Sequence, residues 1–311
     1  LTKVYSNMKK SICLLVTICW NGIFNAQSIL NMNSPEEYRY LKEMRITVNN
    51  LGDTVSTEKP VLPYGYVNPN DIIWAQVVWE VIDLDERVNF PLYYPTDTIG
   101  IGADRRSLYH VLMKNIRNGK LTDVYTDSYF TEKLSGLDDL QATLQKVDTT
   151  DLGYEQYNAG EQISAEFINR RDITAADIEE YRIKGIWYFD KRQGELKYRL
   201  LGVAPVAPDV NFIDSEGSQD ELIELFWVWY PGARYTTHDM KVFNQKNSAF
   251  PLSYDHLLNA RRFNAIIYRE ENIYGNRDVA EYIKGNSLFQ VLESDKLKED
   301  IRDRELDMWN Y

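Results

Sequence analysis

The clearest secondary-structure signal of the chain is the stretch 181–200, YRIKGIWYFDKRQGELKYRL. Apolar and polar side chains alternate over its first half, and they alternate again from Glu195 to Leu200. Between the two halves, Lys191–Gly194 has the polar residues and the glycine that are typical of a tight turn. Alternation with period two on both sides of a turn predicts an antiparallel β-hairpin with one buried face.

The chain after this hairpin continues the mixed pattern. The run 222–230 is apolar on both faces except at Glu224, which predicts a central strand covered on both sides. Three further elements are expected: a short helix capped by Ser253 and ending at Ala260, a strand over 263–268, and a charged helix capped by Ser294 that carries Leu297, Ile301 and Leu306.

The chain before the hairpin contains two candidate helices. Apolar residues recur with helical spacing over 72–84, after the potential cap Asp71, and we expect a helix there. Many of these residues are β-branched and also alternate, so a strand is the alternative. The stretch 104–118 predicts an amphipathic helix, with a stripe of Leu108, Leu112 and Ile116 and with Gly119 as its stop.

These elements predict an α+β fold, an antiparallel or mixed sheet with packed helices. The phrases FPLYY at 90–94 and FPLSY at 250–254 share four of five residues, which suggests an internal duplication and two related halves. We expect five segments along the chain: a signal peptide at 1–26 with an upstream extension at 1–7, an extended arm at 27–69, an N-terminal half of the core at 70–134, an irregular acidic linker or insertion at 135–175, and a C-terminal half of the core at 176–311.

The first 27 residues have the pattern of a secretory signal. Basic residues at 9 and 10 precede an apolar stretch at 11–24, and cleavage is expected after Ala26. Both cysteines, Cys13 and Cys19, lie in the segment that would be removed. The remaining chain would then be soluble and free of thiols, with 32 basic against 47 acidic residues. Such a charge disfavours nucleic acid and anionic lipid as partners.

Sequence motifs of enzymes are missing. The three histidines, His110, His238 and His256, form no metal-ligand spacing, so we expect neither a metal nor a catalytic histidine. The glycines at 100 and 102 lack the third glycine and the lysine of a phosphate loop. Acidic pairs are abundant, but a solvated surface explains them better than catalysis does. We therefore expect no catalytic residue and no cofactor, although a hydrolase with a carboxylate pair is a third-ranked alternative.

Aromatic residues are the feature that stands out, with 22 tyrosines in the chain. Tryptophans within apolar runs are expected in the core, whereas tyrosines and arginines that follow such runs are candidates for a protein interface or a sugar-stacking platform. A basic cluster on this acidic chain is a second candidate for docking, with a solvated face as the alternative. The interface candidates are Tyr93, Tyr94, Arg105, Arg106, Arg117, Tyr230 and Arg234, and Lys114 and Lys120 complete the basic cluster.

Several whole phrases resemble those of one known family. They are IW at 73–74, VWEVIDL at 78–84, NFPLYYP at 89–95, IKGIWYFDK at 183–191, LFWVWYP at 225–231 and NRDVAEYI at 276–283. Together they are similar to the GldN/PorN family of the gliding-motility and type IX secretion apparatus of Bacteroidetes. The resemblance covers about residues 64–283.

This resemblance implies a periplasmic protein held at the outer membrane by a lipoprotein of the GldK/PorK type. Its partners would be that lipoprotein, the periplasmic part of a GldM/PorM-type inner-membrane motor component, and copies of itself in a large ring. The family has no catalytic residues to assign to this sequence. The abundance of tyrosine and tryptophan keeps a secreted carbohydrate-binding module as the alternative function.

Overall fold

The computed structural model describes residues 46–48, 54–56, 61–97, 105–134, 137–160, 162, 164–211, 222–247 and 249–309 of the chain. The chain divides into two compact units, residues 1–32 and 33–311. The expected signal peptide and the glycines at 100 and 102 lie outside the described residues. All elements below belong to the second unit.

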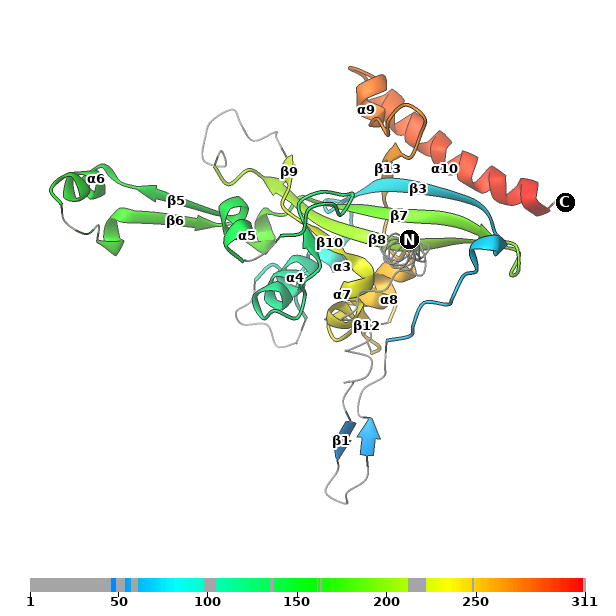
Figure 1. Ribbon diagram of the computed structural model, residues 1–311, viewed down its shortest axis with the longest axis horizontal. Helices are drawn as coiled ribbons and strands as arrows, with labels where there is room; N and C mark the ends of the chain where they lie inside the picture. The colour runs from blue at the N-terminus through cyan, green and yellow to red at the C-terminus, as the bar shows by residue number, and fades with distance from the viewer. Residues whose placement is uncertain are drawn as a thin grey trace, which may run out of the picture. The chain divides into compact units, whose positions relative to one another are not determined.

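An antiparallel sheet of seven strands organises this unit (Figure 1). Its order is β13-β3-β7-β8-β10-β4, and β9 pairs with the far end of β8. The strands are β3 (Ile72–Asp83), β4 (Val124–Tyr125), β7 (Glu180–Asp190), β8 (Glu195–Pro208), β9 (Leu222–Glu224), β10 (Trp227–Trp229) and β13 (Ile266–Glu270). The α+β class with an antiparallel sheet is therefore confirmed.

The predicted hairpin at 181–200 forms the centre of this sheet. Strands β7 and β8 pair from Asp190 and Glu195 outward, and Gly194 closes the turn with a φ of 65°. That backbone conformation is readily accessible to glycine, which has no Cβ. A second glycine, Gly185, lets the ring of Tyr198 cross β7 at a place where a Cβ would overlap the tyrosine hydroxyl.

The prediction of a helix at 72–84 is wrong, because these residues form the long strand β3. Strand β3 pairs along its whole length with β7 and at one end with β13. The spacing of its apolar, often β-branched, side chains fits both a helix and a strand. Pairing with the two neighbouring strands stabilises the strand. The expected strand at 222–230 is divided into β9 and β10, and residue 230 already begins helix α7.

The two expected halves of the core interleave in one sheet. Strands β3 and β4 come from 70–134 and pair with strands from 176–311 on both sides of the β7–β8 hairpin. Their buried side chains share one large hydrophobic cluster. The two similar phrases adopt different structures, since one forms α3 (Phe90–Tyr93) and the other leads into β12 (Leu252–Ser253).

Two groups of helices pack against the sheet (Figure 1). The first group, α4 (Leu108–Arg117), α7 (Tyr230–His238) and α8 (Tyr254–Asn259), contributes to the large cluster. In the second, α9 (Val279–Tyr282) and α10 (Ser287–Trp309) pack Val279, Leu297 and Ile301 against Val78 and Ile267 in a smaller cluster.

The helix caps confirm part of the sequence analysis. The expected helix at 104–118 is α4, in which Leu108, Leu112 and Ile116 are buried, and Ser107 accepts a hydrogen bond from the amide of His110. Ser253 caps α8 as expected. In contrast, α10 begins at Ser287, so Ser294 is a buried residue inside the helix.

Residues 135–175, expected to be an irregular linker or insertion, contain regular elements. After α5 (Leu137–Leu144), strands β5 (Gln145–Thr149) and β6 (Ile168–Asp172) form an antiparallel hairpin that carries α6 (Asp151–Asn158) at its tip. Short 3-10 turns follow at Ala165–Phe167 and Ala175–Asp177. Most side chains of β5 and β6 are at least partly exposed on both faces, so the sequence has no apolar alternation to indicate the strands.

The described part of the expected arm begins with strands β1 (Ile46–Val48) and β2 (Thr54–Ser56), which pair with each other. Residues 61–67 follow, with Val61 and Val67 buried, and the 3-10 turn Pro69–Asp71 leads into β3. A further pair, β11 (Lys241–Val242) and β12, completes the fold.

Candidate functional site

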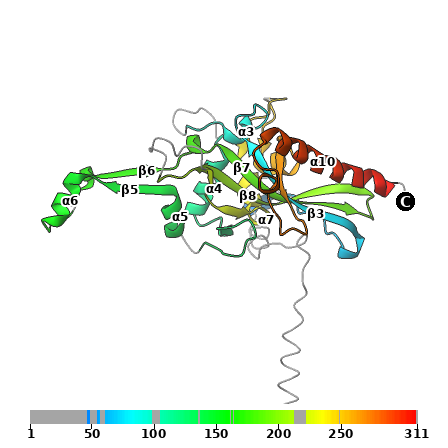
Figure 2. The same ribbon diagram turned by 90° about the horizontal axis from the view of Figure 1, so that it is seen from above.

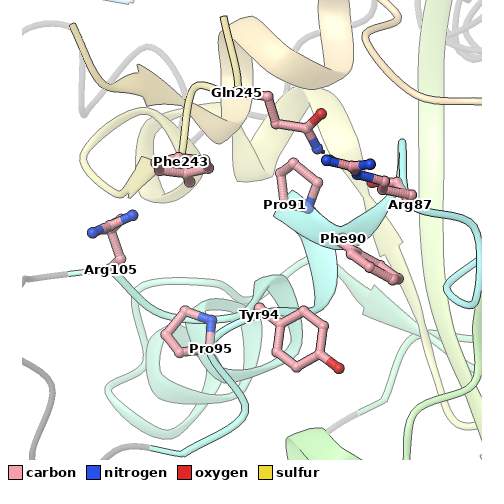
Figure 3. A pocket seen from close by; sticks show the side chains of 8 residues that line it. All are labelled: Arg87, Phe90, Pro91, Tyr94, Pro95, Arg105, Phe243 and Gln245. Atoms are coloured by element: carbon pink, nitrogen blue, oxygen red, sulfur yellow. Dashed lines mark hydrogen bonds between the residues drawn. The ribbon is translucent and has the colours of Figure 1, made fainter. Parts of the chain in front are cut away.

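The candidate site is a partly apolar pocket beside α3, with a volume of about 600 Å³, that we call the groove (Figure 3). Its described lining residues are Arg87, Phe90, Pro91, Tyr94, Pro95, Arg105, Phe243 and Gln245. Figure 3 shows them around an open space, with Arg105 and Phe243 facing Pro91 across it. A second pocket of about 370 Å³ shares Pro91, Phe243 and Gln245 with it.

The first wall of the groove is fixed by a buried asparagine. The side chain of Asn89 donates hydrogen bonds to the backbone oxygens of Asp83 (2.6 Å) and Asn264 (3.1 Å) and accepts one from the amide of Asn264 (2.9 Å). It thereby ties the end of β3 to the segment that leads into β13. Pro91 in the first turn of α3 fits the start of a helix, where a backbone N–H has no helical partner.

The second wall comes from the chain around β11. Phe243 follows this strand directly, and the Arg105 guanidinium lies over its ring at 5.2 Å from the centroid. The Gln245 side chain donates a hydrogen bond of 3.2 Å to the backbone oxygen of Arg87. This contact joins two loops that lie 158 residues apart in the sequence. A cation over an aromatic face and an amide bridge therefore hold the walls together.

The groove and the second pocket carry basic side chains on an acidic chain. The described residues that line the two pockets include five basic side chains and no carboxylate. Of these five, Arg261 forms a two-bond ion pair: its guanidinium donates two hydrogen bonds of 2.8 Å to the buried carboxylate of Glu80. The others are Arg87, Arg105, Lys246 and Arg262. Like-signed charges around an apolar floor favour an occupant that is acidic and partly apolar.

Two of the seven interface candidates from the sequence line the groove. They are Tyr94, whose side chain is 52% exposed, and Arg105. Tyr93 lies edge-on to Tyr94 with ring centroids 4.7 Å apart, and its hydroxyl donates to the backbone oxygen of Ala176. Burial, and then the neighbouring Tyr94 and carboxylates, raise the pKa of Tyr93.

Arg106 and Arg117 have other positions. The Arg106 side chain donates a hydrogen bond of 2.6 Å to the backbone oxygen of Arg105, and Arg117 is exposed at the end of α4. Sequence reasoning did not select the other six lining residues, Arg87, Phe90, Pro91, Pro95, Phe243 and Gln245. Of these, Phe90, Pro91 and Pro95 belong to a quoted family phrase.

Tyr230 and Arg234 are buried, so we do not retain them as candidates for contact with another chain. The Arg234 guanidinium is hydrogen-bonded to Asp255 at 2.9 and 3.2 Å, and the Tyr230 hydroxyl donates to the same carboxylate. Arg234 also lies 3.9 Å from the ring centroid of Tyr64 and donates to the backbone oxygen of Leu62. These side chains fasten residues 62–64 to the core of their own chain.

The described residues contain no group of three or more His, Cys, Asp or Glu side chains that could hold a metal ion. Burial, with Arg106, Lys114 and Arg117 nearby, lowers the pKa of His110. A helix long and apolar enough to cross a membrane is likewise absent from the described part of the chain. None of these features points to a reaction, and the groove is the site that the geometry favours for binding.

The model of a family described as "Gliding motility associated protein GldN" matches residues 67–310. The match includes the groove, the β5–β6 hairpin and α10, and so extends beyond the phrases that suggested the resemblance. No curated protein matches the chain.

Proposed function

Since the chain belongs to the GldN family of gliding motility associated proteins, we propose that it is a structural subunit of the periplasmic ring of the type IX secretion and gliding machinery. Membership of the family makes it a component of that machinery. The ring position and the partners below are the proposal. In this role the protein binds neighbours and transforms no substrate.

The groove is the observation that carries this proposal. Its walls are held by a buried asparagine, by a cation over a ring and by a bridging amide, so its shape is present before any partner arrives. Preformed pockets that combine aromatic side chains with arginine are typical centres of protein interfaces.

The proposed partners are an outer-membrane lipoprotein of the GldK/PorK type, the periplasmic part of a GldM/PorM-type motor component, and further copies of this chain. The lipoprotein would hold the protein at the periplasmic side of the outer membrane. Attachment through a partner agrees with the described helices, none of which can span a membrane.

The size of the complex tests this proposal. The full chain is co-expressed with the lipoprotein partner, purified and analysed by sedimentation velocity. We expect one very large particle that contains both proteins. A chain that sediments as a monomer in the presence of the lipoprotein would contradict the ring proposal.

A secreted carbohydrate-binding module is the second candidate, because Tyr94 and Phe243 expose aromatic faces in the groove. Sugars bind by stacking on such faces. Binding of the full chain to a glycan array, lost in Tyr94→Ala and kept in a control with Tyr66→Ala, would favour this function over the ring.

A further inference from the structure

The tip of the β5–β6 hairpin exposes apolar side chains on an acidic segment. Leu152, Tyr154 and Tyr157 of α6 are 57%, 56% and 67% exposed. Residues 150–167 contain four carboxylates and no lysine or arginine. Tyrosine is enriched in protein interfaces, and three large apolar side chains exposed on one short helix contribute little to folding. We call α6 and its flanking residues 150, 159 and 160 the tip.

The hairpin holds this tip away from the core. At its base, Leu140 and Leu144 of α5 are buried in the large hydrophobic cluster. The strands then pair over five residues each, from Gln145 opposite Asp172 to Thr149 opposite Ile168. Five residues of antiparallel strand span about 17 Å. Figures 1 and 2 both show α6 at the opposite end of this hairpin from α5.

The tip and the groove are complementary in charge and in chemistry. The tip offers the exposed carboxylates of Asp151 and Glu155 beside tyrosine and leucine side chains. The groove offers Arg87 and Arg105 beside aromatic rings and prolines. Its volume of about 600 Å³ has room for more than one of the exposed side chains of the tip. The tip is therefore acidic and the groove basic, and both surfaces expose aromatic side chains.

We infer that the tip of one copy of this chain docks in the groove of the next copy. A contact between two different surfaces of identical chains is heterologous, and repeated contacts of this type close into a ring or extend into a filament. The carboxylates of Asp151 and Glu155 face the guanidinium groups of Arg87 and Arg105, while Tyr154 and Tyr157 cover the apolar floor. This inference rests on the proposed function and deepens it, because it names the surfaces through which neighbouring subunits meet.

Charge reversal tests this contact. One variant reverses the tip (Asp151→Lys and Glu155→Lys), and the other reverses the groove (Arg87→Glu and Arg105→Glu). All four residues belong to exposed or half-exposed surfaces, so the fold is expected to persist, and circular dichroism checks this. The full chain is expressed with the secretory signal that we expect, so that the cell can remove it. Self-association of the purified protein is then measured by sedimentation velocity over a concentration series.

Each variant alone should associate about tenfold or more weakly than the wild type, because like charges then face each other. An equimolar mixture should regain association, since the reversed tip fits the reversed groove and the native tip fits the native groove. The control Asp303→Lys with Asp307→Lys makes the same net-charge change as the reversed tip, on the exposed end of α10, and should associate like the wild type.

Three results would overturn the tip-to-groove contact: variants that associate like the wild type, a mixture that stays dissociated, or a wild-type chain that is monomeric when alone. The ring proposal survives each of them, because its own test includes the lipoprotein. If the variants still form the large particle with the lipoprotein, the subunits meet through other surfaces.

Discussion

Replacement of Arg234 by methionine should destabilise the fold strongly. The guanidinium and the Asp255 carboxylate are a buried ion pair, with side chains 5% and 9% exposed. Burial disfavours the charged guanidinium, but the hydrogen bonds that Arg234 donates to Asp255 outweigh it and raise the pKa of Arg234. Arg234→Met leaves the carboxylate buried with neutral donors only, from Tyr230 and Asn259.

The expected size of the effect follows from the geometry. Two opposite charges about 4 Å apart attract each other by about 4 kcal/mol at an effective dielectric constant of about 20. Removal of one partner from a buried pair typically destabilises a protein by about 3–5 kcal/mol. Loss of the contacts to Tyr64 and Leu62 acts in the same direction. We therefore expect the free energy of unfolding to fall by about 4 kcal/mol.

Urea unfolding followed by tryptophan fluorescence measures this change. The double variant Arg234→Met with Asp255→Asn should be more stable than Arg234→Met alone, because it removes the unpaired charge. A control at an exposed arginine, Arg304→Met, should change the unfolding free energy by less than about 0.5 kcal/mol. If Arg234→Met is as stable as the wild type but assembles poorly, Arg234 is an interface residue after all and the reasoning is refuted.

Three further predictions concern other buried groups. Desolvation lowers the pKa of Lys184 to about 8. Between about pH 7 and pH 10 the folded chain therefore binds fewer protons than the unfolded chain, and the stability of the fold should rise with pH. Between pH 7 and 9.5 the wild type should gain about 2 kcal/mol relative to Lys184→Met in urea titrations, and parallel pH profiles would disprove this. Gly185→Ala should lower the unfolding free energy by about 1–3 kcal/mol, because the added Cβ overlaps the Tyr198 hydroxyl. The control Gly65→Ala, with open space around the added Cβ, should change the unfolding free energy by less than about 0.5 kcal/mol. Equal urea midpoints for the two variants would argue against the overlap. Asn89→Ala should lower the unfolding free energy by at least about 2 kcal/mol, because the buried Asn89 side chain bonds three backbone groups that then lose this partner. An unchanged midpoint would mean that Asn89 does not fix the first wall.

Local signals in the sequence predicted the central hairpin and the Ser253 cap of α8. The alternation around Lys191–Gly194 needs only neighbouring residues, and so does a serine that caps the helix directly after it. Strand β3 was missed because its residues fit a helix and a strand about equally well. Its pairing with β7, about 100 residues away, decides the outcome, and no local pattern contains that information.

The groove was only partly predictable for a similar reason. Tyr94 and Arg105 were selected because aromatic and basic residues are common at interfaces. Phe243 and Gln245 lie on a separate loop and join the site only when the chain folds. Arg234 shows the opposite failure, because the sequence does not reveal that Asp255 and Tyr64 bury it. Residue type indicated a protein interface, and long-range packing determined which residues line the groove.

Electron microscopy of the full chain, purified together with its lipoprotein partner, tests the central claim most directly. The ring account predicts closed rings that contain many copies of both proteins around one axis. Isolated particles with one copy of each protein, and no closed assembly at any concentration, would contradict it.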